Sequence, residues 1–235
     1  MSERLAVMRR GITLLELLVA FTLLGAVFAA LPRASASDRA RRADRDGQRL
    51  AADAADLLAR DLRAGLSAAL LGDTALELTR SLGVGATCEA VVPGLVVDAE
   101  SRVWLDEPRV GDTLAVWRDT TWAHHVVDRV AAERCSAGRR GTRLSMVAVP
   151  TAAPVQILRR VRWVVYRDPD GRAQLGLRDR RGARWSATQP AVGPADSLRL
   201  GLAVDGPLAR VEVHAALGGR WQRAERQVAQ RNAWP

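Results

Sequence analysis

Residues 9–32 of the chain read RRGITLLELLVAFTLLGAVFAALP, a basic pair and a glycine followed by a long apolar run. The twenty residues from Ile12 to Leu31 would form a helix of roughly 30 Å, which matches the hydrocarbon thickness of a bilayer. The far end of the run, LPR, lacks the small-residue cleavage site of an ordinary secretory signal peptide. The stretch therefore predicts a helix that crosses a membrane and remains part of the chain.

One acidic residue, Glu16, lies inside this apolar run, five positions after Gly11. A carboxylate in lipid costs on the order of 2 to 3 kcal/mol, and less near an interface, so such a residue usually has a partner and a function. A simple membrane anchor would rarely carry one. We therefore treat Glu16 as a candidate functional residue.

The order of basic residues, Gly11 and then ITLLELLVA resembles the class III signal of type IV prepilins and type II secretion pseudopilins. The resemblance implies that a prepilin peptidase cuts between Gly11 and Ile12 and methylates the new amino terminus at Ile12. It also implies that Glu16 pairs with the terminal amine of a neighbouring subunit and sets the register of assembly. Two features depart from the usual pattern: Ile12 stands where the family usually has Phe, and Pro32, a candidate kink, lies one position early.

Orientation in the membrane follows from the resemblance rather than from charge. Three arginines precede the span, and arginines at positions 33, 39, 41, 42 and 45 follow it, so the positive-inside rule does not favour a cytoplasmic amino terminus. The peptidase requires a cytoplasmic leader. The resemblance thus implies a single-pass protein of a bacterial inner membrane, with a leader (1–11), a transmembrane helix (12–32) and a periplasmic remainder.

Beyond the span, apolar residues recur at helical spacing through residues 33–72. They are Leu50, Ala54, Leu57, Leu58, Leu62, Leu66 and Leu70. The spacing predicts an amphipathic spine helix or linker whose apolar stripe packs on the remainder of the chain. An independent helix behind a flexible linker at Gly47 is the alternative.

Residues 73–235 contain short runs of β-branched residues and tryptophan, separated by turn sequences. The clearest runs are 91–97, 113–118, 124–130, 142–149, 161–166, 173–177, 198–204 and 209–217. Asp168-Pro169-Asp170-Gly171 predicts a hairpin between two of them. The expected fold is α+β, a long amino-terminal helix packed on a mostly antiparallel β head, and the order of runs resembles the J-type minor pseudopilin or the W-type minor pilin.

The two cysteines, Cys88 and Cys135, allow one intramolecular disulfide, which an oxidising compartment would permit. Its loop would contribute about 3 to 5 kcal/mol in the chain-entropy model. Two buried free thiols are the alternative.

No constellation in the sequence indicates catalysis, a metal or a cofactor. His124 and His125 are adjacent, so on a strand they point to opposite faces, and His214 stands alone. No phosphate loop, paired CxxC motif or loop of alternating Asp residues for calcium occurs. We expect a protein that is not an enzyme and needs no cofactor.

The net charge of +9 arises from 35 basic residues, all of them Arg, against 26 acidic ones. The arginines are mixed with Asp and Glu along the chain, whereas a phosphate-binding surface gathers its cations on one face, so nucleic acid is not an expected partner. Among seven tryptophans, Trp221 and Trp234 lie near the charged carboxyl-terminal tail and are the best candidates for subunit contacts.

These observations favour a minor pilin or pseudopilin, a structural subunit at or near the tip of a filament. Its expected partners are the prepilin peptidase, sibling pilin subunits and inner-membrane lipid. A type IV pilus, a type II secretion pseudopilus and a competence system fit equally well. The alternative is a membrane-anchored periplasmic binding protein, for example one that captures DNA, carrying the same leader.

Overall fold

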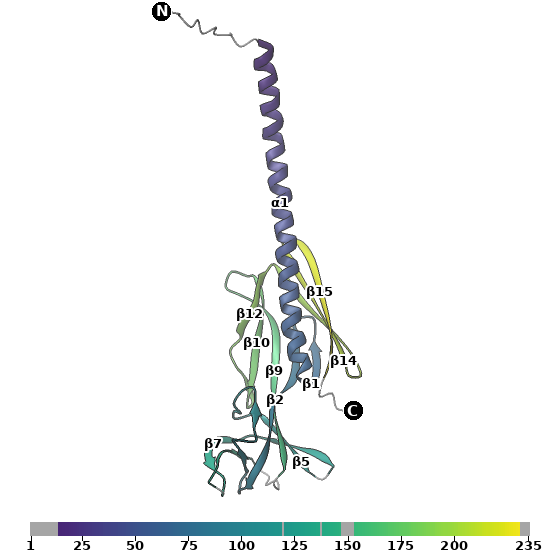
Figure 1. Cartoon of the computed structure of the whole chain (residues 1–235). Helices are drawn as coiled ribbons and strands as arrows, with labels where there is room; N and C mark the ends of the chain where they lie inside the picture. The colour runs from purple at the N-terminus through teal and green to yellow at the C-terminus, as the bar shows by residue number, and fades with distance from the viewer. Residues whose placement is uncertain (1–13, 119, 137, 147–152, 231–235) are drawn as a thin grey trace, which may run out of the picture.

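The structure, a computed structural model, describes residues 14–118, 120–136, 138–146 and 153–230. A single long helix, α1 (Leu14–Arg63), rises from a head built of β-strands (Figure 1). The strands are β1 (Gly65–Leu71), β2 (Ala75–Ala90), β3 (Leu95–Asp98), β4 (Val103–Trp104), β5 (Thr113–Arg118), β6 (Thr121–Val126), β7 (Arg129–Arg134), β8 (Arg140–Ser145), β9 (Pro154–Arg167), β10 (Ala173–Arg181), β11 (Arg184–Trp185), β12 (Gln189–Ala195), β13 (Ser197–Asp205), β14 (Leu208–Leu217) and β15 (Arg220–Ala229). Their pairing is antiparallel, which confirms the predicted α+β class.

The second half of α1 packs on the head through a stripe of mostly small residues. Gly47, Ala51, Ala55, Leu58 and Leu62 recur every three or four positions, and all five are buried. The small side chains let the strands approach closely, since a Cβ at Gly47 would lie 3.1 Å from Cγ of Gln222 in β15. The stripe thus fastens the helix to the carboxyl-terminal sheet.

The helix is continuous through Pro32 and Gly47, so the alternative of a flexible linker is wrong. The predicted helical stripe is wrong at its end. Helix α1 ends at Arg63, and both Leu66 and Leu70 belong to β1. Both leucines are half-buried on one face of that strand. Residues four apart satisfy the period of a strand as well as that of a helix, which explains the error.

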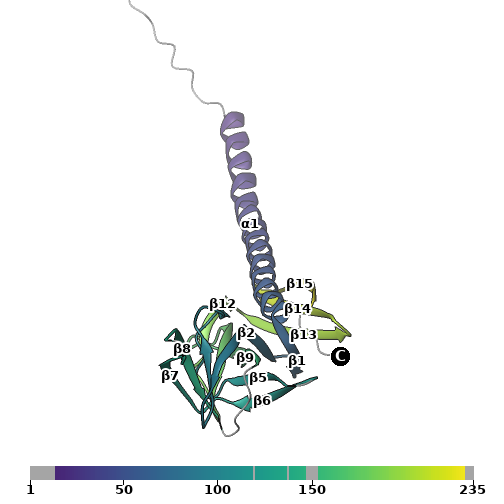
Figure 2. The same ribbon diagram turned by 60° about the horizontal axis from the view of Figure 1, so that its bottom comes forward.

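Two long antiparallel strands, β2 and β9, form the centre of the larger sheet, and β10 continues it on the other side of β9. The predicted hairpin between β9 and β10 is confirmed, with Gly171 at a positive φ of 77° in its turn. The carboxyl-terminal strands β13, β14 and β15 form a separate sheet. Figure 2 shows the end of α1 between these two groups of strands.

The head has two cores. The upper core joins α1 to both sheets through residues such as Leu58, Leu76 and Val213. The lower core lies beyond the end of the helix, where β3, β5 and β8 cover the far ends of β2 and β9 around Leu95, Leu114 and Leu144. We call this second region the distal lobe.

Two predicted runs differ from the observed strands. Run 91–97 is interrupted by a turn at Val92-Pro93-Gly94, because proline cannot donate to the ladder. Run 124–130 is divided between β6 and β7. Part of run 142–149 lies outside the described residues. The strands β1, β2, β4, β11, β12 and β15 were not predicted.

Candidate assembly interface

The first half of α1 carries an apolar surface that the head does not cover. Every described side chain at positions 14–32 is exposed, including Phe21 and Phe28 at 64% each. The helix contains an 18-residue window of mean hydropathy 2.4 and is the one described helix long and apolar enough to cross a membrane. Such a surface needs lipid or other apolar helices around it.

The polar groups of this half are few and locally arranged. Thr22 donates its hydroxyl hydrogen bond to the carbonyl of Val19 at 2.8 Å, so the hydroxyl is satisfied inside the helix. Glu16 lies in the first turn of α1, at the end away from the head. The predicted cleavage residues Gly11 and Ile12 lie outside the described residues.

Residues 7–32 match the family model described as "Prokaryotic N-terminal methylation motif". The chain carries a prepilin-type, class III signal. No curated protein and no solved structure matches the chain. The match includes residues 14–32, the exposed apolar half of α1. It supports a pilin-like or pseudopilin-like protein that a prepilin peptidase processes and that assembles with other pilin subunits.

The buried half of α1 is tied to the head by carboxylates of the helix. Asp44 accepts a hydrogen bond from Arg220 of β15 at 2.8 Å. Asp61 accepts one from the indole nitrogen of Trp163 in β9 at 2.9 Å. These contacts hold the helix to both sheets, so the apolar half projects from a fixed base.

A further ion pair joins Asp56 of α1 to Arg226 of β15, with 3.2 Å between Oδ2 and Nη2. The hydrogen bond from Arg226 holds the pKa of Asp56 below its ordinary value, and the same contact raises the pKa of Arg226. Both side chains are solvent-exposed, so the pair adds little to the free energy of unfolding. Its main effect is on how α1 is positioned against β15.

The two predicted disulfide cysteines are joined in the structure. Cys88 at the end of β2 is bonded to Cys135 after β7, with the Cα atoms 5.9 Å apart. The bond ties the edge of the distal lobe to the central strand of the head.

A buried charge cluster in the head was missed by sequence reasoning. Arg159 of β9 is 1% exposed and makes two hydrogen bonds of 2.8 Å to the carboxylate of Asp112. It also pairs with Asp106 and donates to the carbonyl of Glu107 at 2.9 Å. Burial alone would lower the pKa of Arg159, but the hydrogen bonds to both aspartates outweigh it and raise that pKa. In the sequence, Asp106 and Asp112 flank the residues EPRVG. This pattern predicts a solvated loop as long as its contact with Arg159 of β9 is unknown.

The three histidines, all among the described residues, lie on two separate strands, β6 and β14. His124 is exposed and His125 half-buried on β6, while Nε2 of His214 lies 3.5 Å from Glu212. No group of three His, Cys, Asp or Glu side chains that could hold a metal occurs among the described residues.

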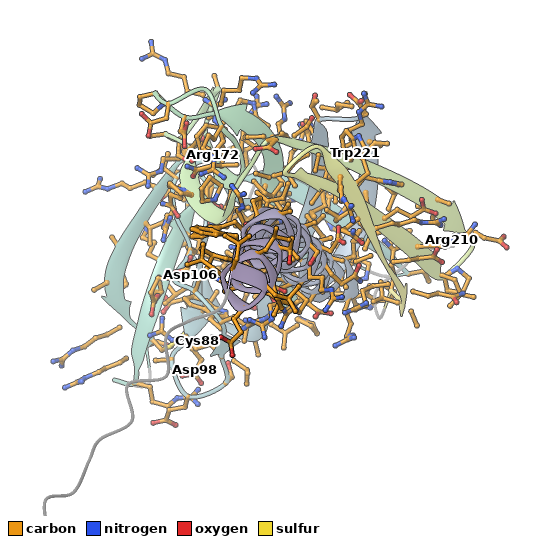
Figure 3. All side chains as sticks on the ribbon, turned by 90° about the horizontal axis from the view of Figure 1, so that it is seen from above. Cys88, Asp98, Asp106, Arg172, Arg210 and Trp221 are labelled. Carbon is orange, nitrogen blue, oxygen red and sulfur yellow. A yellow bond between two sulfur atoms is a disulfide. The ribbon has the colours of Figure 1, made fainter. Side chains whose placement is uncertain are left out.

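Of the two tryptophans proposed for subunit contacts, the structure describes one. Trp221 of β15 is 48% exposed, and the guanidinium of Arg199 lies 5.2 Å from its ring centre. Trp234 lies outside the described residues. Figure 3 shows Trp221 on the carboxyl-terminal sheet, away from Cys88 and the distal lobe.

Acid sensitivity of the head follows from its ion-paired carboxylates. Burial alone would raise the pKa of Glu77, but hydrogen bonds from Arg162 and Arg160 bring it below the ordinary 4.5. The pKa of Asp106 is likewise held below 3.8, because contacts with Arg159 and Arg109 outweigh its burial. A depressed folded-state pKa gives stability that is present above the unfolded value and is lost as the pH falls through the folded value.

We therefore expect the urea midpoint of the head to stay level from about pH 7 to about pH 5 and to fall below about pH 4. Tryptophan fluorescence of the full chain in detergent would measure it. Glu77→Gln should reduce the size of the acid drop. A midpoint that is unchanged or higher at low pH would contradict the expectation.

Proposed function

We propose that the chain is a minor pilin or minor pseudopilin, a structural subunit without enzymatic activity that packs by its helix into a type IV pilus or a type II secretion pseudopilus. One observation carries the proposal. Residues 14–32 of the methylation motif form the start of a continuous 50-residue helix whose first half is exposed and apolar and whose second half is fastened to a folded head. This arrangement suits a subunit whose apolar half is surrounded by lipid before assembly and by neighbouring helices in the filament.

The register of packing is the proposed role of Glu16. After cleavage the amino group of Ile12, cationic even when methylated, would lie about one helical turn from Glu16 along the subunit. In a filament the amine of one subunit can pair with the carboxylate of the next, so that the two opposite charges neutralise each other inside the apolar bundle.

A position at or near the tip is supported by the breadth of the head. Viewed down α1, the β9–β10 hairpin, whose turn holds Arg172, and strand β14, which carries Arg210, extend to opposite sides of the helix (Figure 3). The distal lobe adds further volume beyond the end of the helix (Figure 2). Heads of this breadth would crowd one another along a tight helical lattice, whereas a terminal position leaves room.

Before assembly, the subunit is stored in the bacterial inner membrane with its head in the periplasm. A periplasmic head is exposed to oxidising conditions, in which the Cys88–Cys135 disulfide persists.

The intact mass of the protein from cells with a functional prepilin peptidase tests the proposal. We expect a chain that begins at Ile12 and carries one additional methyl group. Gly11→Val should keep the leader, while Gly25→Ala, at a glycine with open space around it, should be processed as the wild type. An intact leader on the wild-type chain, or a cut elsewhere, would contradict the proposal and return the anchored binding protein to consideration.

A further inference from the structure

Three arginines surround α1 between its apolar half and the head. We call Arg39, Arg41 and Arg42 the arginine collar; all three side chains are exposed. Among the described residues, none of the three forms an ion pair, although Asp38 lies beside them in sequence. Farther along the helix, Asp44 is already paired with Arg220 of the head. Within the part of the chain that the structure describes, the collar is therefore a cationic surface whose side chains have no acidic partner.

The position of the collar follows from helix geometry. If the hydrocarbon layer ends at Leu31, the Cα of Arg39 lies about 12 Å beyond it at 1.5 Å per residue. Side chains on a helix lean toward its amino terminus, here toward the bilayer. Nε of Arg39 donates to the carbonyl of Ser35 at 3.3 Å, which brings this guanidinium back by one turn, to about 6 Å beyond the hydrocarbon.

That level is the level of the lipid headgroups. The polar region adds about 5 to 8 Å on each side of the hydrocarbon core. The guanidinium of Arg39 thus reaches the phosphates, and Arg41 and Arg42 lie within about one Debye length of them, roughly 8 Å at physiological ionic strength. Guanidinium groups bind phosphate oxygens in a bidentate manner, which suits them to this contact better than to open solvent.

We infer that the arginine collar binds anionic phospholipid headgroups on the head side of the membrane and fixes the depth of the stored subunit. The inference rests on the proposed membrane anchoring. The collar also accounts for a charge distribution that opposes the positive-inside rule. Asp44, which pairs with Arg220 of the head, lies thirteen residues beyond Leu31, so a helix held at this depth keeps the near edge of the head about 20 Å from the hydrocarbon.

Lipid selectivity of the full chain in vesicles tests the inference. The chain would be reconstituted in phosphatidylcholine containing either spin-labelled phosphatidylglycerol or spin-labelled phosphatidylcholine, and the motionally restricted fraction of each label compared. Since one basic residue near an anionic surface gives roughly a fivefold preference, we expect at least about a fivefold excess of phosphatidylglycerol at low salt. The excess should fall toward one in about 1 M salt, where the Debye length is roughly 3 Å.

Matched variants distinguish the effect of the collar's position from the effect of the chain's net charge. Combined substitution Arg39→Gln, Arg41→Gln and Arg42→Gln should lower the excess of phosphatidylglycerol about fivefold or more, while the charges at positions 33 and 45 remain. Glutamine preserves the helix because its helix propensity is similar. The control carries Arg129→Gln, Arg134→Gln and Arg140→Gln, which removes the same charge from exposed positions in the distal lobe. This control should bind phosphatidylglycerol as the wild type does.

Two outcomes would overturn the inference, and they differ in what else they overturn. In the first outcome, the wild-type chain remains in the vesicles after alkaline extraction but shows no lipid selectivity. The collar would then bind another partner, such as an acidic face of a sibling subunit. A chain extracted from the vesicles would overturn the proposed membrane anchoring as well.

Discussion

Glu16→Ala is expected to leave cleavage after Gly11 intact and to remove the subunit from assembled filaments. Once the carboxylate is lost, the terminal amine of the neighbouring subunit stays buried in the helical bundle without a counter-charge. Removing one partner of a buried ion pair typically costs about 3 to 5 kcal/mol. Because about 1.4 kcal/mol corresponds to a tenfold change, we expect incorporation to fall by more than about a hundredfold. Sheared filaments and membranes, compared by quantitative immunoblotting, would measure the two pools.

Two variants of the same helix sharpen this test. Thr22→Ala removes a polar group that is satisfied inside the helix by Val19, so it should assemble almost normally. Glu16→Asp keeps the charge on a shorter side chain and should retain part of the incorporation. If Glu16→Ala were incorporated as efficiently as Thr22→Ala, the proposed pairing of Glu16 with a terminal amine would be wrong.

The parts of the molecule that sequence reasoning found are those with local signals. An apolar run long enough to span a membrane, with one acidic residue near its start, is rarely produced by other folds, and residues 7–32 match a family model for that reason. The hairpin at Asp168-Pro169-Asp170-Gly171 was equally clear, since its turn chemistry is confined to four consecutive residues.

The parts that sequence reasoning missed depend on partners distant in the chain. In the sequence, strand β15 resembles a charged tail, RWQRAERQVA. Only Ala224 and Val228 of its inward face are fully buried, and Arg220 pairs with a carboxylate of α1. Strand β2 contains two glycines that lower its apparent strand propensity, and one of them, Gly83, is required by the close approach of the Val103 carbonyl. Neither feature can be recognised until α1 and β4 are in place.

The buried charge cluster around Arg159 leads to the second large expected effect. Arg159→Met should lower the free energy of unfolding by about 3 to 5 kcal/mol, because it leaves the carboxylate of Asp112 buried without its two hydrogen bonds. For a chain of this size, such a loss corresponds to a fall in melting temperature of roughly 10 °C. Urea denaturation of the full chain in detergent, followed by tryptophan fluorescence, would measure the loss.

The neighbouring arginine supplies the matched control, since Arg160 lies on the opposite face of β9, is 51% exposed and pairs with Glu77. Arg160→Met should cost no more than about 1 kcal/mol, the usual range for an exposed pair. A double variant, Arg159→Met with Asp112→Leu, removes both charges and should lose less stability than the sum of the two single variants, because neither ion is then left alone in the core. The cluster anchors the loop at residues 106–112 to the central strand of the head. If Arg159→Met proved no more destabilising than Arg160→Met, that loop would have to be held by its apolar contacts, and the charge cluster would contribute only the register of the loop on β9.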